Sequence, residues 1–107
     1  MLTRMKQPRR DPPKAQTLLD ARVKQGEHAF AQLRVVRVPE PVRGSRHLFK
    51  YSLVYVVDGQ CVLRFDNEAG KGDHCHVGTL ETSYTFITID HLLADFWRQV
   101  DDLEAMT

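Results

Sequence analysis

The residues with the greatest capacity for chemistry lie in one segment of the chain, Asp66–His76, which reads DNEAGKGDHCH. Its eleven residues include two histidines, one lysine, one cysteine and three carboxylates. Imidazole groups transfer protons near neutral pH, and glycines let a backbone turn sharply or approach an anion closely. This segment is therefore the candidate site of the chain.

Metal-free cleavage of RNA is the reaction that these groups favour. It needs a base for the ribose 2′-hydroxyl, an acid for the leaving oxygen and a cation for the charged phosphorane. We predict His74 and His76 as the acid and base, because side chains two residues apart in an extended backbone point the same way. Lys71 would contact the phosphate, and Asp66 would orient a histidine or the loop.

Further contacts to RNA are predicted outside this segment. Arg46 and Arg43, in the loop before a strongly predicted strand, would supply supporting cations. Lys50 is a candidate phosphate contact if its end of the strand is exposed. Tyr51 has two interpretations, as a ring that stacks on a base or as a buried core residue.

Two other interpretations of the segment stay open. His74 and His76 could bind a metal with Asp66, Asp73 or Cys75, but a lone His-x-His is a weak signal because zinc normally takes at least three protein ligands. We therefore predict no metal and no cofactor. In a purely structural interpretation, the first two residues of the segment cap the hairpin end and the histidines bond to local carbonyls.

The elements that would position this segment predict an α+β fold. We expect an antiparallel sheet of four or five strands with a C-terminal amphipathic helix packed on one face. Apolar alternation and turn residues place the strands at 17–23, 28–38, 47–57, 60–65 and 83–87. Thr88 is the predicted helix N-cap. The apolar helix face comprises Ile89, Leu92, Leu93, Phe96, Val100 and Leu103. The segment 66–78 is expected to be a polar loop.

A two-residue Asp58–Gly59 turn sets the expected register of the central hairpin. It places Tyr55 opposite Val62, and it predicts two apolar faces. The first face, which could take the helix, holds Val54, Val56, Cys61, Leu63 and Phe65, with Cys61 as a buried thiol. The second, aromatic face could take another part of the chain, a second copy or a partner, and its members are Phe49, Tyr51, Leu53, Tyr55 and Val62.

Length and charge indicate one domain with a basic lead-in. The chain has 107 residues, enough for one domain and not two. We predict a disordered basic segment at 1–16, with five basic residues and one acidic residue, followed by a single domain at 17–107 with ten basic and thirteen acidic residues. No apolar run approaches the length of a membrane span, and no secretory signal is visible, so we expect a cytoplasmic protein.

Several stretches resemble the TumE family, small bacterial and archaeal toxins of toxin–antitoxin pairs. They are PEP at 39–41, HLFKYSL at 47–53, YVVDG at 55–59, RFDNEAGKGDHCH at 64–76 and LLADF at 92–96. The resemblance implies a growth-inhibiting toxin and a cognate antitoxin, usually a helix-turn-helix DNA-binding protein. It also implies a departure, because the family often has a basic residue where Cys75 stands. If that position helps neutralise phosphate, this chain would be a weaker enzyme or inactive.

Together these features lead us to expect a toxin that cleaves cellular RNA without a metal. The alternatives are a non-catalytic toxin that binds a target through the aromatic sheet face, and a regulatory subunit whose basic segment touches DNA. A homodimer is a further possibility.

Overall fold

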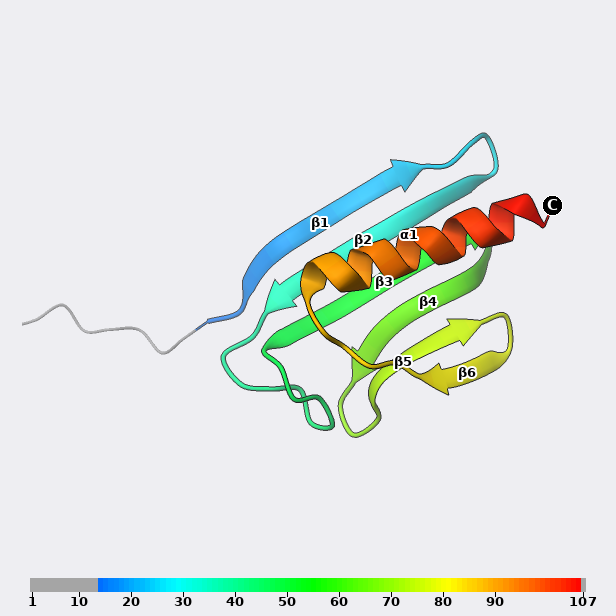
Figure 1. Ribbon diagram of the computed structural model, residues 1–107. Coiled ribbons are helices and arrows are strands. Elements are labelled where there is room, and N and C mark those ends of the chain that lie inside the picture. Colours follow the sequence, from blue (N-terminus) through cyan, green and yellow to red (C-terminus); the bar gives the residue numbers. More distant parts are fainter. Residues whose placement is uncertain (1–13, 107) are drawn as a thin grey trace, which may run out of the picture.

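The computed structural model describes residues 14–106, which form one antiparallel sheet and one helix. The strands are β1 Gln16–Lys24, β2 Ala29–Arg37, β3 Phe49–Val57, β4 Gln60–Glu68, β5 Gly72–Val77 and β6 Leu80–Ser83, and the helix is α1 Ile89–Ala105. Each strand pairs with the next along the chain, in the order β1-β2-β3-β4-β5-β6. Helix α1 lies across one face of this sheet (Figure 1). Residues 1–13 of the predicted basic segment lie outside the described residues.

The predicted α+β class is confirmed, but the strand count of four or five was wrong. The structure has six strands in its described part, because the expected polar loop at 66–78 is largely extended and supplies β5. The strand expected at 83–87 was also wrong, because β6 ends at Ser83 and residues 84–88 are not a strand. Strand β4 continues to Glu68, and β5 begins at Gly72. Gly70 and Gly72 have φ values of 89° and 72°, in the left-handed region that glycine adopts without steric cost. They close a tight turn that lets the polar flanks pair.

The β3–β4 hairpin begins as predicted and then changes register. Asp58 and Gly59 both have positive φ, and the first two residue pairs after this turn follow the expected pattern. The register then shifts at a bulge, so that Tyr55 lies opposite Leu63 instead of Val62. An extra residue in one strand moves every later side chain to the other face.

This shift corrects the predicted faces of the sheet. Leu63 and Phe65 join the aromatic residues of β3 beneath α1, instead of facing away from them. The helix therefore covers the face that was expected to be aromatic and available. Cys61, predicted to be a buried thiol, is exposed on the opposite face.

The core lies between α1 and this face of the sheet. Leu92, Phe96 and Val100 of the helix are each fully buried, and full burial of such a side chain contributes about 1.5–3 kcal/mol. They pack against a cluster whose sheet members include Leu33, Val35, Tyr51, Leu53, Tyr55, Leu63 and Phe65. The helix thus fixes β3 and β4, the strands that precede the candidate site.

The start of α1 is set by Thr88, as the sequence predicts. Its side-chain hydroxyl accepts a hydrogen bond from the backbone N–H of His91 at 3.0 Å. We expect Thr88→Ala to lower the free energy of unfolding by about 1 kcal/mol, because a first-turn N–H loses its acceptor. Urea unfolding of both proteins measures this difference, and Thr88→Ser should restore most of it.

The second face of the sheet has no covering element among residues 14–106, and we call it the open face. Alternation along the strands assigns its side chains. Those used below are Arg22, Phe30, Arg34, Lys50, Val54, Val56 and Arg64. The Arg22 guanidinium lies 3.7 Å from the centre of the Phe30 ring. The open face therefore carries several cations around a small apolar centre, and one of them, Arg34, pairs with Asp20 at 3.1 Å.

Candidate active site

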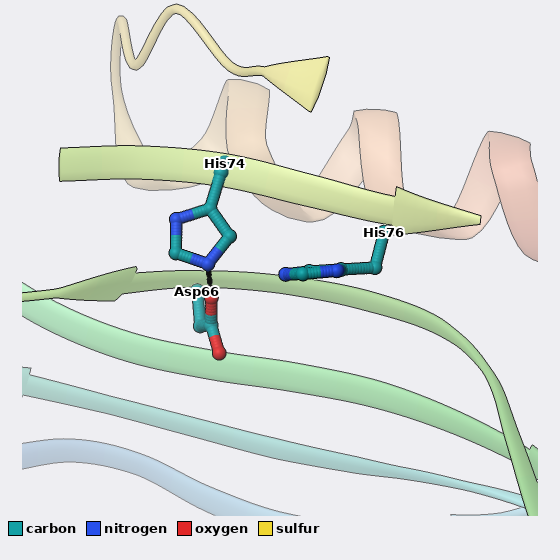
Figure 2. A group of neighbouring side chains, drawn as sticks. All are labelled: Asp66, His74 and His76. Carbon is teal, nitrogen blue, oxygen red and sulfur yellow. Dashed lines mark ion pairs between the residues drawn. The ribbon is translucent and has the colours of Figure 1, made fainter. Parts of the chain in front are cut away.

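The candidate site is built where β5 pairs with β4, at one side of the open face. His74 lies opposite Asp66, and His76 lies opposite Arg64. Because paired antiparallel residues share a face, these four side chains project from the same side of the sheet. The structure therefore brings together three of the four predicted catalytic residues, Asp66, His74 and His76, on strands and not on a loop (Figure 2).

His74 is the buried member of this cluster, with 4% of its surface exposed. Its Nδ1 lies 2.9 Å from the carbonyl oxygen of Gly72. A carbonyl only accepts hydrogen bonds, so this contact assigns the Nδ1 proton and directs Nε2 into the cluster. Nε2 lies 2.6 Å from Oδ1 of Asp66.

The Asp66 carboxylate is incompletely satisfied. Its contact with His74 is an ion pair by distance, but Oδ1 is buried and has no hydrogen-bond donor among the described residues. Most buried polar atoms do have a partner. The buried floor of the cluster thus holds an oxygen with unused capacity to accept a proton or bind a cation.

His76 forms the accessible side of the cluster. Its side chain is 30% exposed, and its Nε2 lies 4.0 Å from Oε1 of Glu81 on β6. Its ring is edge-on to that of His74, with ring centres 4.8 Å apart. His76 is therefore the imidazole that an incoming molecule meets first.

The same three residues offer a set of metal ligands. One ligand atom from each of Asp66, His74 and His76 lies within 4.8 Å of the others. Two imidazoles and a carboxylate are donors that transition metals such as zinc accept.

A second polar cluster lies on the other side of β5, and sequence analysis missed it. Asp73 accepts hydrogen bonds from Ser45 Oγ at 2.6 Å, Tyr51 OH at 2.6 Å and His47 Nε2 at 2.7 Å. The His47 ring also stacks on Phe86, with ring centres 3.8 Å apart. His47 and Ser45 carried no local signal, because only the strand order brings residues 45–47 beside residue 73.

The electrostatics of this second cluster are those of a fixed carboxylate. Burial raises the pKa of Asp73, but the hydrogen bonds from Ser45, Tyr51 and His47 outweigh it and hold that pKa below its usual value. Burial, followed by the hydrogen bond to Asp73, raises the pKa of Tyr51. Tyr51 is only 2% exposed, so its ring is not available to stack on a base.

The cations predicted to contact RNA lie on the open face and at the end of the sheet near the turn that precedes β5. Arg46 and Lys71 line a cavity of about 370 Å³ together with His47 and Asp73, on the side of β5 away from His74. The Arg43 carbonyl accepts a hydrogen bond from the Gly70 N–H at 2.7 Å. Lys50 lies on the open face. Lys71 is therefore not beside the histidines, and Arg64, which sequence analysis did not select, is the cation opposite His76.

Close backbone contact holds the cation-bearing loop against the site. A Cβ atom at Gly44 would lie 2.7 Å from the Gly72 nitrogen, and one at Gly72 would lie 2.7 Å from the Gly44 oxygen. Only glycine fits at both positions, so the loop 42–46 packs directly on the strand that carries His74.

Comparison with known families decides the wider assignment. The family model described as Toxin TumE matches residues 5–104 of the chain. The chain belongs to the TumE toxin family. Membership implies a toxin role and, in general, an antitoxin partner. Neither the curated proteins nor the solved structures contain a match to this chain. No helix within residues 14–106 has the length and apolar character to cross a bilayer.

Cys75, where the resemblance leads us to expect a basic residue, lies away from the cluster of Asp66, His74 and His76. Cys75 pairs with Phe65 on the side of the sheet that α1 covers, and it is 6% exposed. Burial raises the pKa of its thiol. Because His74 and His76 project from the opposite side, the position of Cys75 gives no support to the expected weakening of phosphate binding.

Proposed function

We propose that this TumE-family toxin is an endoribonuclease that cleaves cellular RNA in the cytoplasm without a metal. The observation that carries the proposal is the cluster at one side of an open face that carries several cations. In it the exposed His76 adjoins the buried pair of His74 and Asp66, whose Nε2 and Oδ1 atoms are 2.6 Å apart. Two imidazoles supply the two proton transfers that RNA cleavage needs.

The roles follow from exposure and partners. We assign His76 as the base that takes the 2′-hydroxyl proton, since it is the more exposed imidazole. The 2′-oxygen then attacks phosphorus, and the bond to the 5′-oxygen breaks. We assign His74 as the acid: the proton on its Nε2, which faces Oδ1 of Asp66, passes to this oxygen, while the Gly72 carbonyl holds Nδ1 and Asp66 balances the imidazolium charge. The products are a 2′,3′-cyclic phosphate and a 5′-hydroxyl.

The basic side chains near the cluster would bind the phosphates of the RNA substrate. Arg64, which lies opposite His76, would contact the scissile phosphate. Lys50 on the open face, with Lys71, Arg46 and Arg43 at the end of the sheet, would contact flanking phosphates. This assignment moves the main phosphate contact from Lys71 to Arg64.

The alternative hypothesis, a non-catalytic toxin that binds its target through the aromatic sheet face, is not supported, because α1 covers that face. Tyr51 and Tyr55 are 2% and 3% exposed beneath α1. The other alternative is a regulatory subunit whose basic segment at 1–16 contacts DNA. Most of that segment lies outside the described part of the chain.

We also propose that the antitoxin is a helix-turn-helix protein encoded beside this chain. A short adjacent reading frame with that pattern, whose product copurifies with the toxin, supports this proposal. A copurifying partner without a DNA-binding domain overturns it. Mass measurement of the purified toxin tests the possible homodimer.

Purified protein and a fluorescent RNA oligonucleotide test the proposed activity. We expect cleavage that persists in EDTA and leaves 2′,3′-cyclic phosphate ends, whereas the same oligonucleotide with 2′-O-methyl groups stays intact. RNA that remains whole under all conditions, although the protein still arrests growth, overturns the proposal.

Arg64→Ala tests the phosphate contact. A hydrogen bond to a charged group is worth about 1.5–3 kcal/mol, so we expect the cleavage rate at low substrate to fall roughly 10–100-fold. Arg98→Ala, which removes an exposed cation on α1, is the matched control and should cleave normally. Equal rates for the two variants contradict the role of Arg64.

A further inference from the structure

The strongest unexplained feature of the molecule is the buried Oδ1 atom of Asp66. It lies 2.6 Å from Nε2 of His74 without a hydrogen bond, so its partner among the described residues is an ion pair that exists only while His74 is protonated. A buried carboxylate oxygen without a donor is costly. A cation that binds this oxygen and the neighbouring nitrogen would remove that cost.

The second observation is how His74 is held. Its Nδ1 is anchored on the Gly72 carbonyl at 2.9 Å, so its other nitrogen presents a lone pair to the cluster whenever the ring is neutral. Histidines that bind metals commonly have this support, because a carbonyl on one nitrogen fixes the tautomer and aims the other at the metal. Gly72 owes its position to the close backbone contact with Gly44.

The third observation is the spacing of the donors. Tetrahedral zinc, with bonds of about 2.0–2.1 Å, places its ligand atoms roughly 3.3 Å apart. The three donor atoms lie within 4.8 Å of one another, so small side-chain shifts, including separation of His74 Nε2 from Asp66 Oδ1 at 2.6 Å, bring them to this spacing. Glu81, 4.0 Å from His76 Nε2, or a water molecule can complete four ligands. Magnesium and calcium prefer oxygen ligands, so the two imidazoles favour zinc.

We infer that Asp66, His74 and His76 bind one divalent transition-metal ion of the zinc class. The bound ion occupies the nitrogen lone pairs that proton transfer requires. The inference has a regulatory consequence, which rests on the proposed ribonuclease function: zinc switches the toxin off by filling its acid–base site. Metal binding and metal-free catalysis then exclude one another.

Direct binding tests the site without any assay of activity. EDTA-treated, dialysed full-length protein is titrated with Zn²⁺ in competition with a chromophoric chelator. We expect one Zn²⁺ per chain, with affinity reduced at least about tenfold in His76→Ala and in Asp66→Asn. His91→Ala is the matched control, because His91 also lies beside a carboxylate, Asp95 at 3.2 Å. Its affinity should be unchanged.

Co²⁺ provides an independent readout of the ligand geometry. Tetrahedral binding gives intense visible absorption, which we expect in the wild type and in His91→Ala but not in His76→Ala. Circular dichroism tests whether the variants are folded. Because His76 is partly exposed, His76→Ala is less prone to misfold than Asp66→Asn. Absence of Zn²⁺ binding by the wild type, or wild-type affinity in both His76→Ala and Asp66→Asn, overturns the site.

The activity of the same samples separates this inference from the proposed function. If metal-free protein cleaves RNA and one equivalent of Zn²⁺ stops it, both stand. If Zn²⁺ binds as expected but metal-free protein never cleaves RNA, the ribonuclease proposal fails and the metal site stands. If Zn²⁺ binds and cleavage continues, the inhibitory role is wrong.

Discussion

Replacing His76 by alanine is expected to lower RNA cleavage by at least about 100-fold and to relieve growth arrest, because general acid–base catalysis contributes about 10²–10⁴ to a rate. His76 is the 30%-exposed imidazole of the cluster and lies opposite Arg64. Its truncation removes the proposed base and leaves the buried pair of His74 and Asp66 intact. The loss should therefore appear in the rate of the chemical step.

Two measurements distinguish a slower chemical step in His76→Ala from weaker RNA binding. Single-turnover cleavage of the RNA oligonucleotide isolates the chemical step from RNA binding, and fluorescence anisotropy with a 2′-O-methyl RNA shows whether binding survives. His91→Ala controls for loss of an exposed histidine and should cleave and arrest growth like the wild type. If His76→Ala keeps more than half of the wild-type single-turnover rate, His76 is not the base.

The central hairpin shows how far local sequence patterns determine the fold. Asp58–Gly59 predicts the turn because both residues can adopt positive φ, and the structure has both there. The bulge beside Tyr55 has no such local mark. It is favoured by tertiary packing, because only the shifted register places Leu63 and Phe65 under α1 with Tyr55. A one-residue error therefore reversed the predicted faces.

Strand β5 shows the same limit at the candidate site. Charged residues and glycines between 66 and 78 predict a loop, but pairing with β4 satisfies the backbone and turns the segment into a strand. The spacing of His74 and His76 was sufficient to place both imidazoles on one side, since alternation is a property of any extended chain. Their distances to Asp66 needed the register.

The long-range partners of β5 were beyond any local pattern. Asp73 and His74 are adjacent in sequence, yet one faces the cavity beside Arg46 and the other faces the open face. The residues that bind Asp73 come from β3 and the loop before it, more than twenty positions away. A polar residue in the middle of a chemically rich segment can thus be structural, while its neighbour belongs to the proposed site.

Asp73→Ala is accordingly expected to be the most destabilising single substitution in the polar part of the molecule, by about 3–5 kcal/mol. The carboxylate accepts from Ser45, Tyr51 and His47, and its side chain is only 9% exposed. Removing it leaves a hydroxyl, a phenol and an imidazole without their acceptor. Tyr51, 2% exposed, cannot turn to water in compensation.

Urea unfolding followed by circular dichroism measures this loss, with Asp102→Ala as the matched control. Asp102 is exposed near the end of α1, and truncation of such a residue should change the free energy of unfolding by less than about 0.5 kcal/mol. Tyr51→Phe removes one donor and keeps the carboxylate, so it should cost about 1–2 kcal/mol. If Asp73→Ala costs no more than Asp102→Ala, the three hydrogen bonds do not hold the loop before β3 against β5. The ordering of Asp73→Ala above Tyr51→Phe above Asp102→Ala follows from the hydrogen bonds to Asp73 that each change removes, which are three, one and none.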